Sequence, residues 1–169
     1  MDNFIHVIFF GKPARPLYSQ KTNFMKNNAI DNVTKTLILL VIMVHALFFI
    51  LEALLWMQPE VYTRLLYFLD NPVALDDPLQ AIVLKKLFIN QGFYNLFLAF
   101  AGLKGLQLLK TGKYAAGYAL ILFLCFAATG AGIVLASSTK AYALAFFQAV
   151  PAAMAFARLV PLYKNETSK

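Results

Sequence analysis

Long apolar stretches alternate with short polar connections along most of this chain. A helix that crosses the roughly 30 Å hydrocarbon layer of a membrane needs about 20 apolar residues, at about 1.5 Å per residue. The stretches that meet this requirement are 36–56, 87–109, 114–136 and 141–162. The pattern therefore predicts an all-α integral membrane protein with four transmembrane helices in an antiparallel bundle, formed by residues 35–163.

Composition argues for a membrane protein and against a soluble one. Hydrophobic residues make up 60% of the 169 residues, whereas about 45–50% is typical of a soluble domain. Charged residues make up only 14% and lie mostly between the apolar stretches. The net charge is +7, but the basic residues form no stripe with interleaved aromatic residues. Nucleic acid is therefore not expected as a partner. The expected partner is the lipid bilayer.

The positions of Lys and Arg predict the orientation of the helices. If the amino terminus is cytoplasmic, the basic residues on the cytoplasmic side are Lys12, Arg15, Lys21, Lys26, Lys35, Lys104, Lys110, Lys113, Arg158, Lys164 and Lys169. The opposite side then holds only Arg64, Lys85, Lys86 and Lys140. Because cytoplasmic segments carry an excess of Lys and Arg, both termini are predicted to be cytoplasmic.

Three segments lie outside the predicted helices. Residues 1–34 are interpreted as a cytoplasmic leader with a short apolar surface segment, without a cleavable signal peptide, and with Met25 as an alternative start. Residues 164–169 form a cytoplasmic tail. The outer connection, 57–86, is too long for a turn, and its pattern suggests a short interfacial helix at 61–69 followed by an acidic loop. This connection is either a solvated connector or a lid over a pocket.

Polar side chains inside the predicted helices gather near one depth, in the outer half of the membrane. His45 and Glu52 are seven residues apart on the first helix, which places them within about 20° of one face and about 10 Å apart along its axis. Aromatic residues flank that face, namely Phe48, Phe49 and Trp56. The other helices contribute polar residues at a similar depth, namely Asn90, Gln91, Tyr94, Asn95, Thr129 and Gln148.

These polar groups are expected to face inward and to pair, because an ionised carboxylate at mid-helix costs about 2.5–3.5 kcal/mol on insertion scales. His45 and Glu52 are the candidate catalytic residues, through a shared or exchanged proton. The flanking aromatic residues and the other polar residues are candidates for ligand binding. The alternative is that the polar groups only hold the helices together, at about 0.6 kcal/mol for each hydrogen bond.

Small residues and metal motifs change this interpretation little. Close helix contact is expected at Gly102, Gly105, Gly117, Gly130 and Gly132. No complete set of metal ligands, phosphate loop or nucleophile elbow is visible, so no metal is predicted and the cofactor is unknown.

Three stretches resemble the domain of unknown function 1304 family, a group of small bacterial membrane proteins. They are 45–56, 90–99 and 148–152, so the resemblance covers about residues 36–161. The residues that match the family's motifs are His45, Glu52, Trp56, Asn90, Gln91, Tyr94, Asn95 and Gln148. The resemblance implies a four-helix domain in the bacterial inner (cytoplasmic) membrane and no established activity. The leader and the extended acidic connection depart from the family pattern.

Four functions remain open from the sequence. The leading hypothesis is a pocket that binds an apolar or amphipathic small molecule and acts on it as an isomerase or hydrolase, with Glu52 as proton donor or acceptor and His45 as its partner. Proton-coupled transport through Glu52 is the second, and it requires a homo-oligomer. The third is a haem held by His45. The fourth is an accessory subunit whose polar layer only joins helices.

Overall fold

The computed structural model describes residues 30–70 and 72–168, and this part of the chain is helical, without strands. Its elements in chain order are α3 (Asn32–Phe49), the π-helix η1 (Ile50–Leu54), α4 (Pro59–Leu69), α5 (Asp77–Lys110), α6 (Tyr114–Ser138) and α7 (Tyr142–Thr167). The prediction of an all-α fold is confirmed for these residues. The predicted surface segment and the alternative start at Met25 lie outside the described residues.

Within the described residues, three helical segments are long and apolar enough to cross a membrane. They are Asn32–Leu54, which joins α3 to η1, Tyr114–Ser138 and Tyr142–Thr167. They correspond to the first, third and fourth predicted spans. The second predicted span lies in α5, where the amides of Asn90, Gln91 and Asn95 lower the hydropathy. A fourth span therefore stays a prediction, whereas the membrane character of the protein does not depend on it.

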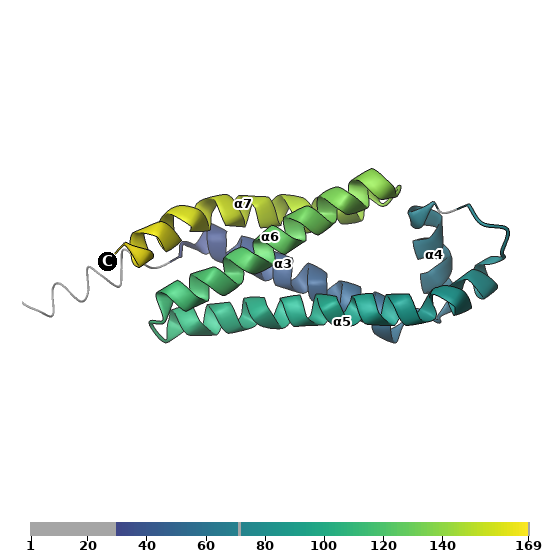
Figure 1. The fold of residues 1–169 in the computed structure, drawn as a ribbon, viewed down its shortest axis with the longest axis horizontal. Coiled ribbons are helices and arrows are strands. Elements are labelled where there is room, and N and C mark those ends of the chain that lie inside the picture. Colours follow the sequence, from purple (N-terminus) through teal and green to yellow (C-terminus); the bar gives the residue numbers. More distant parts are fainter. Residues whose placement is uncertain (1–29, 71, 169) are drawn as a thin grey trace, which may run out of the picture.

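The four long helices lie side by side and alternate in direction along the chain (Figure 1). Both α5 and α7 pack against α3 and against α6. Short connections between α5 and α6 and between α6 and α7 make consecutive helices antiparallel neighbours. The short helix α4 lies across one end of this arrangement, against α5 (Figure 1). One end of the packed helices is thereby covered.

The long connection after the first helix is mostly helical. The predicted short helix is present as α4, which ends at Asp70 in the left-handed conformation (φ 50°). The predicted acidic loop is wrong in part, because α5 begins there at Asp77. Asp76 is its N-cap and accepts a hydrogen bond from the N–H of Leu79 at 3.2 Å, and Pro78 lies in the first turn. Acidic residues and Pro favour such a helix start, so the pattern fits a helix better than a loop.

Small and branched side chains fill the core between the long helices. The buried residues of this core are Ile38, Val41, Ile42, Ala99, Tyr118, Ile121, Leu124, Cys125, Ala128, Ala152, Ala155 and Leu159. A Cβ added at Gly102 would lie 2.7 Å from the side chain of Ile42, and one added at Gly105 would lie 3.0 Å from the carbonyl of Gly117. Close contact is confirmed at these glycines and at Gly132. It is wrong for Gly130, which has nothing within 4 Å.

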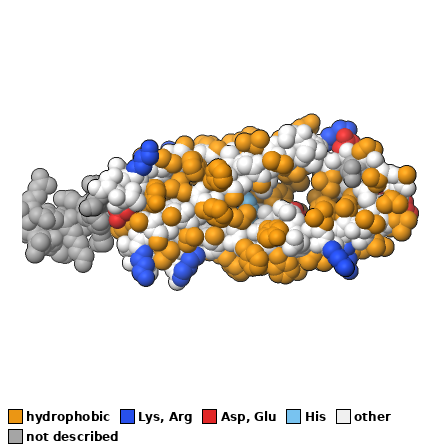
Figure 2. Space-filling model, in the orientation of Figure 1, with side chains coloured by type: hydrophobic (Ala, Val, Ile, Leu, Met, Phe, Trp, Pro, Cys, Tyr) orange, Lys and Arg blue, Asp and Glu red, His pale blue; other side chains and the backbone are white. Residues whose placement is uncertain are grey.

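The outer surface suits lipid. Figure 2 shows hydrophobic side chains over the flank of the molecule, and Lys and Arg near its two ends. Large apolar side chains exposed on α5 include Phe93, Phe97, Phe100 and Leu103, which recur at helical spacing. An apolar surface of this extent would favour association in water but is the ordinary exterior of a membrane protein.

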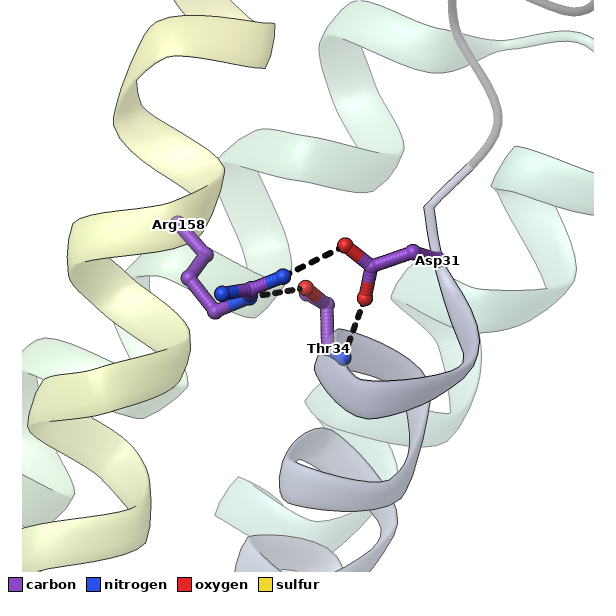
Figure 3. A network of polar contacts seen from close by, with 3 residues as sticks. All are labelled: Asp31, Thr34 and Arg158. Atoms are coloured by element: carbon purple, nitrogen blue, oxygen red, sulfur yellow. Dashed lines mark hydrogen bonds and ion pairs between the residues drawn. The ribbon is translucent and has the colours of Figure 1, made fainter.

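Arg158 joins α7 to the amino end of α3 (Figure 3). Asp31 is the N-cap of α3 and accepts a hydrogen bond from the N–H of Thr34 at 2.7 Å. The guanidinium of Arg158 donates to the carboxylate of Asp31 at 2.6 Å and to the hydroxyl of Thr34 at 2.8 Å. Its position near the end of α7 therefore serves an interhelical contact.

Candidate ligand-binding site

The helix changes from α to π where it reaches Glu52. Within Ile50–Leu54 each turn holds an extra residue, and the N–H of Leu55 donates to the carbonyl of Ile50 at 2.9 Å. Such turns are rare and are frequently found at functional sites. Because the angle between residues differs from that of an α-helix, the offset predicted for His45 and Glu52 from an ideal α-helix does not hold within η1.

A close approach between η1 and α5 brings Glu52 to Asn95. A Cβ added at Gly92 would lie 2.8 Å from the Cβ of Ala53, so only glycine fits there without displacement. Asn95 follows Gly92 by three residues and thus lies on the same face of α5. Its side-chain amide donates to Oε2 of Glu52 at 2.8 Å. The sequence places the two residues 43 positions apart, and the structure joins them directly.

Both residues of this pair line a cavity of about 470 Å³, which is called here the Glu52 cavity. The residues that line it are Phe48, Leu51, Glu52, Leu65, Phe68, Leu69, Leu87, Phe88, Gln91, Asn95, Ala131, Val134, Leu135, Ser138, Thr139, Ala141, Leu144 and Gln148. Figure 2 shows the surface hollowed between the long helices and the end that carries α4. Its size falls within the roughly 300–1,000 Å³ of small-molecule sites. Most of the lining is apolar, as in such sites.

The polar groups of the cavity come from separate helices. Gln148 of α7 is buried and lines the cavity together with Gln91 of α5. Neither side chain forms a hydrogen bond with another residue of the described chain, so both amides are available to a ligand. Gln148 is held at this level by a close contact of α6 with α7, where a Cβ added at Gly132 would lie 2.7 Å from that of Ala149.

Glu52 is the only ionisable side chain among the residues that line the cavity. Its carboxylate is partly buried, and Asn95 gives it a hydrogen bond but no counter-charge. No Lys or Arg belongs to the lining. The arrangement therefore accepts a hydrogen-bond donor or a cationic group better than an anion.

The helix α4 forms the end wall of the cavity through Leu65, Phe68 and Leu69. The connection between α6 and α7 holds it in place: the N–H of Lys140 donates to the carbonyl of Phe68 at 2.9 Å, and Nζ of Lys140 lies 2.8 Å from the carboxylate of Asp70. Of the two interpretations of the long connection, this placement agrees with the lid.

Trp56 fixes the turn that leads from η1 to α4. Its indole N–H donates to the carbonyl of Ala81 at 2.9 Å, and its ring stacks on Phe88 with centroids 3.6 Å apart. It is buried in a small cluster with Tyr62, Leu66 and Ala81. Trp56 therefore supports the wall of the cavity through Phe88 and does not itself line it.

No hydrogen bond joins His45 to Glu52 in the structure. The imidazole is fully buried, and Nδ1 lies 2.8 Å from the carbonyl of Val41, to which it donates. Nε2 has no hydrogen-bond partner among residues 30–70 and 72–168. The ring is not part of the cavity lining. The geometry thus gives no support to proton exchange between the two residues, nor to an axial haem ligand, which needs an accessible face.

Other candidate residues lie outside the cavity lining. Phe49 packs edge-on against Phe93, with ring centroids 5.4 Å apart. Asn90 and Tyr94 are exposed on the surface of α5. The hydroxyl of Thr129 donates to the carbonyl of Cys125 at 2.7 Å, within its own helix. Phe49 and Thr129 therefore make contacts away from the cavity lining.

The sequence missed most of the apolar lining. Phe68 and Leu69 were visible only as part of an interfacial helix, and Ser138 and Thr139 only as the end of a span. The amphipathic pattern of the connection was the one available signal, because a helix with an apolar face must cover something.

Comparison with known proteins gives a family and no activity. The family model described as "Protein of unknown function (DUF1304)" matches residues 39–160, which is most of the chain. No curated protein and no solved structure matches the chain.

Proposed function

The chain belongs to the DUF1304 family, a family of unknown function, and on that premise we propose that it is a membrane protein that binds an amphipathic small molecule in the Glu52 cavity. The observation that carries this proposal is the Glu52–Asn95 hydrogen bond within a mostly apolar cavity. A polar pair that only joined helices would be expected to lie enclosed between them. This pair instead lines the cavity.

The lining indicates the class of ligand. One carboxylate, the amides of Gln91, Asn95 and Gln148, and no basic residue favour a ligand that carries a hydroxyl or an amino group. The apolar remainder of the wall favours a hydrocarbon body. We therefore propose an apolar molecule with one polar donor, of the size class that such a cavity holds.

Acid–base chemistry is the narrower form of this proposal. Glu52 is the one lining residue that can take or give a proton at an ordinary pH. Its predicted partner His45 is hydrogen-bonded to the carbonyl of Val41 instead. Glu52 therefore has no second catalytic group in the predicted pair. Binding is accordingly the function that the geometry supports best, and isomerisation or hydrolysis would depend on Glu52 alone.

The test is the content of the purified protein. Organic extracts of the full-length protein, of Glu52→Gln and of Glu60→Gln are compared by mass spectrometry. Glu60→Gln is the matched control, because it makes the same chemical change on the exposed start of α4, outside the cavity. We expect a compound enriched in the protein and in the control, and reduced about tenfold or more in Glu52→Gln, as for the loss of a hydrogen bond to a charged group.

A second variant separates ligand loss from misfolding. Ala131→Phe places a large side chain at an exposed position of the cavity lining and leaves the residues of the polar pair unchanged. It should also lower the amount of bound compound. Equal amounts in all four proteins, or nothing beyond the bulk lipids in the wild type, would contradict the proposal.

We also propose that α5 is the fourth transmembrane helix and that both termini are cytoplasmic, in the inner membrane of a bacterium. The support for α5 is its place beside the spanning helices α3 and α6, with Asn95 turned inward and Phe97 and Phe100 turned outward. The support for the orientation is the excess of basic residues at the end that holds Lys110 and Lys113. This completes a four-helix membrane bundle around the cavity.

A further inference from the structure

A second cavity, of about 510 Å³, lies at the other end of the helices, between the amino end of α3 and the carboxyl end of α5. It shares no residue with the Glu52 cavity. Its apolar lining includes Leu39, Leu103, Leu106 and Leu109, and its polar residues include Lys35, Gln107 and Lys110. This second cavity is called here the basic groove.

The charges of the basic groove are not compensated. None of the described residues that line it is acidic. Within residues 30–70 and 72–168 neither Lys35 nor Lys110 forms an ion pair, since the ion pairs there join Lys140 to Asp70 and Arg158 to Asp31. The nearby carboxylate of Asp31 is already engaged by Arg158 and by the N–H of Thr34 (Figure 3).

The groove also has a direction. Lys35 precedes Leu39 by one turn of α3, and Lys110 follows Leu103 and Leu106 by about two turns and one turn of α5. Because α3 starts at this end and α5 finishes there (Figure 1), Lys35 and Lys110 lie nearer the helix ends than Leu39, Leu103 and Leu106 do. A soluble anion would use only the rim, whereas the whole groove matches a molecule with an anionic head and a hydrocarbon tail.

We propose that the basic groove binds one anionic phospholipid, with its phosphate between Lys35 and Lys110 and an acyl chain along Leu39, Leu103 and Leu106. Basic pockets between transmembrane helices commonly hold anionic headgroups. The nearby Lys104, whose ammonium donates to Gln107 at 3.0 Å, orients that amide at the rim. The site is independent of the Glu52 cavity, so the two proposals stand or fall separately.

The experiment measures lipid retention by native mass spectrometry. The full-length protein in neutral detergent is incubated with dioleoyl phosphatidylglycerol or with dioleoyl phosphatidylcholine. We expect one retained phosphatidylglycerol and no retained phosphatidylcholine. The double variant Lys35→Gln/Lys110→Gln should weaken retention about 25-fold, since each basic residue near an anionic surface contributes a factor of about five. Lys35→Arg/Lys110→Arg should retain the lipid and thereby show that the variant fold is intact.

The matched control is Lys85→Gln/Lys86→Gln, which removes the same charge from exposed positions near the start of α5, at the other end of the molecule. It should retain the lipid as the wild type does. Equal losses in the two Gln variants would overturn the proposal, because they would show a general charge effect. Displacement of the lipid by millimolar inorganic phosphate would also overturn it, since the groove would then be a site for a soluble anion.

Discussion

At Gly92 the absence of a side chain decides whether Glu52 and Asn95 meet. The backbone of η1 approaches α5 so closely there that an added Cβ would also lie 2.9 Å from the backbone nitrogen of Ala53. A backbone atom cannot rotate away as the end of a long side chain can. The geometry of the polar pair is therefore set by a residue that carries no functional group, and by the π turn that positions Glu52.

Substituting Gly92→Ala should separate η1 from α5 and lower the free energy of unfolding by about 1–3 kcal/mol, the usual cost of overpacking. The matched control is Gly130→Ala, also within a helix but with nothing within 4 Å of the added Cβ. That variant should unfold at the wild-type temperature or slightly above it, because Ala favours a helix over Gly by up to about 1 kcal/mol. Thermal unfolding in detergent, followed by circular dichroism, compares the two. Equal midpoints for both variants would argue against the close contact.

At the scale of elements, caps and side-chain clasps determine where helices begin and which ends meet. Asp31 caps the start of α3, and the same carboxylate accepts a hydrogen bond from Arg158 of α7. The hydrogen bond from the N–H of Thr34 and the guanidinium of Arg158 lower the pKa of Asp31 from 3.8 to about 2. The first and last helices are thereby joined at the end that carries the basic groove.

The contact between Asp31 and Arg158 should make the stability of the fold depend on pH in the acidic range. A carboxyl group with a lowered pKa stabilises the fold above its unfolded pKa, and this contribution is lost as the pH falls through the folded pKa. Between about pH 4 and pH 2 the unfolding temperature of the wild type should therefore fall more steeply than that of Asp31→Asn. Circular dichroism melts in detergent at stepped pH measure the difference, and parallel curves for the two proteins would contradict the assignment. Arg158→Gln should weaken the wild-type dependence in the same direction.

At the scale of the whole molecule, an apolar flank lies between two ends that carry the charges (Figure 2). Three helices can span a membrane by length and composition, and α5 is packed between two of them. The proposed fourth span in α5 would share the hydrocarbon layer with these neighbours. Its Asn95 amide is hydrogen-bonded to Glu52 and faces the cavity.

The two ends of α5 should accordingly be accessible from opposite sides of the membrane. Single cysteines at Lys85→Cys and at Lys113→Cys are introduced in a Cys125→Ser background, where the native thiol is buried. Both positions are exposed in the structure. In intact bacterial cells an impermeant maleimide should label position 85, and position 113 only after the membrane is opened. Labelling of both positions from one side would show that α5 does not cross.

The sequence by itself determined the helical class, the membrane character and the family, because apolar length, charge distribution and local motifs act through short-range rules. It also brought forward Glu52, Asn95, Gln91 and Gln148 as polar residues at one depth, and all four line one cavity. Only the tertiary structure decided that His45 bonds to the carbonyl of Val41, that Asn90 and Tyr94 face outward, and that α4 forms an end wall. The reason is physical: the face that a residue presents depends on a π turn and on contacts between distant helices, and neither follows a fixed period along the chain.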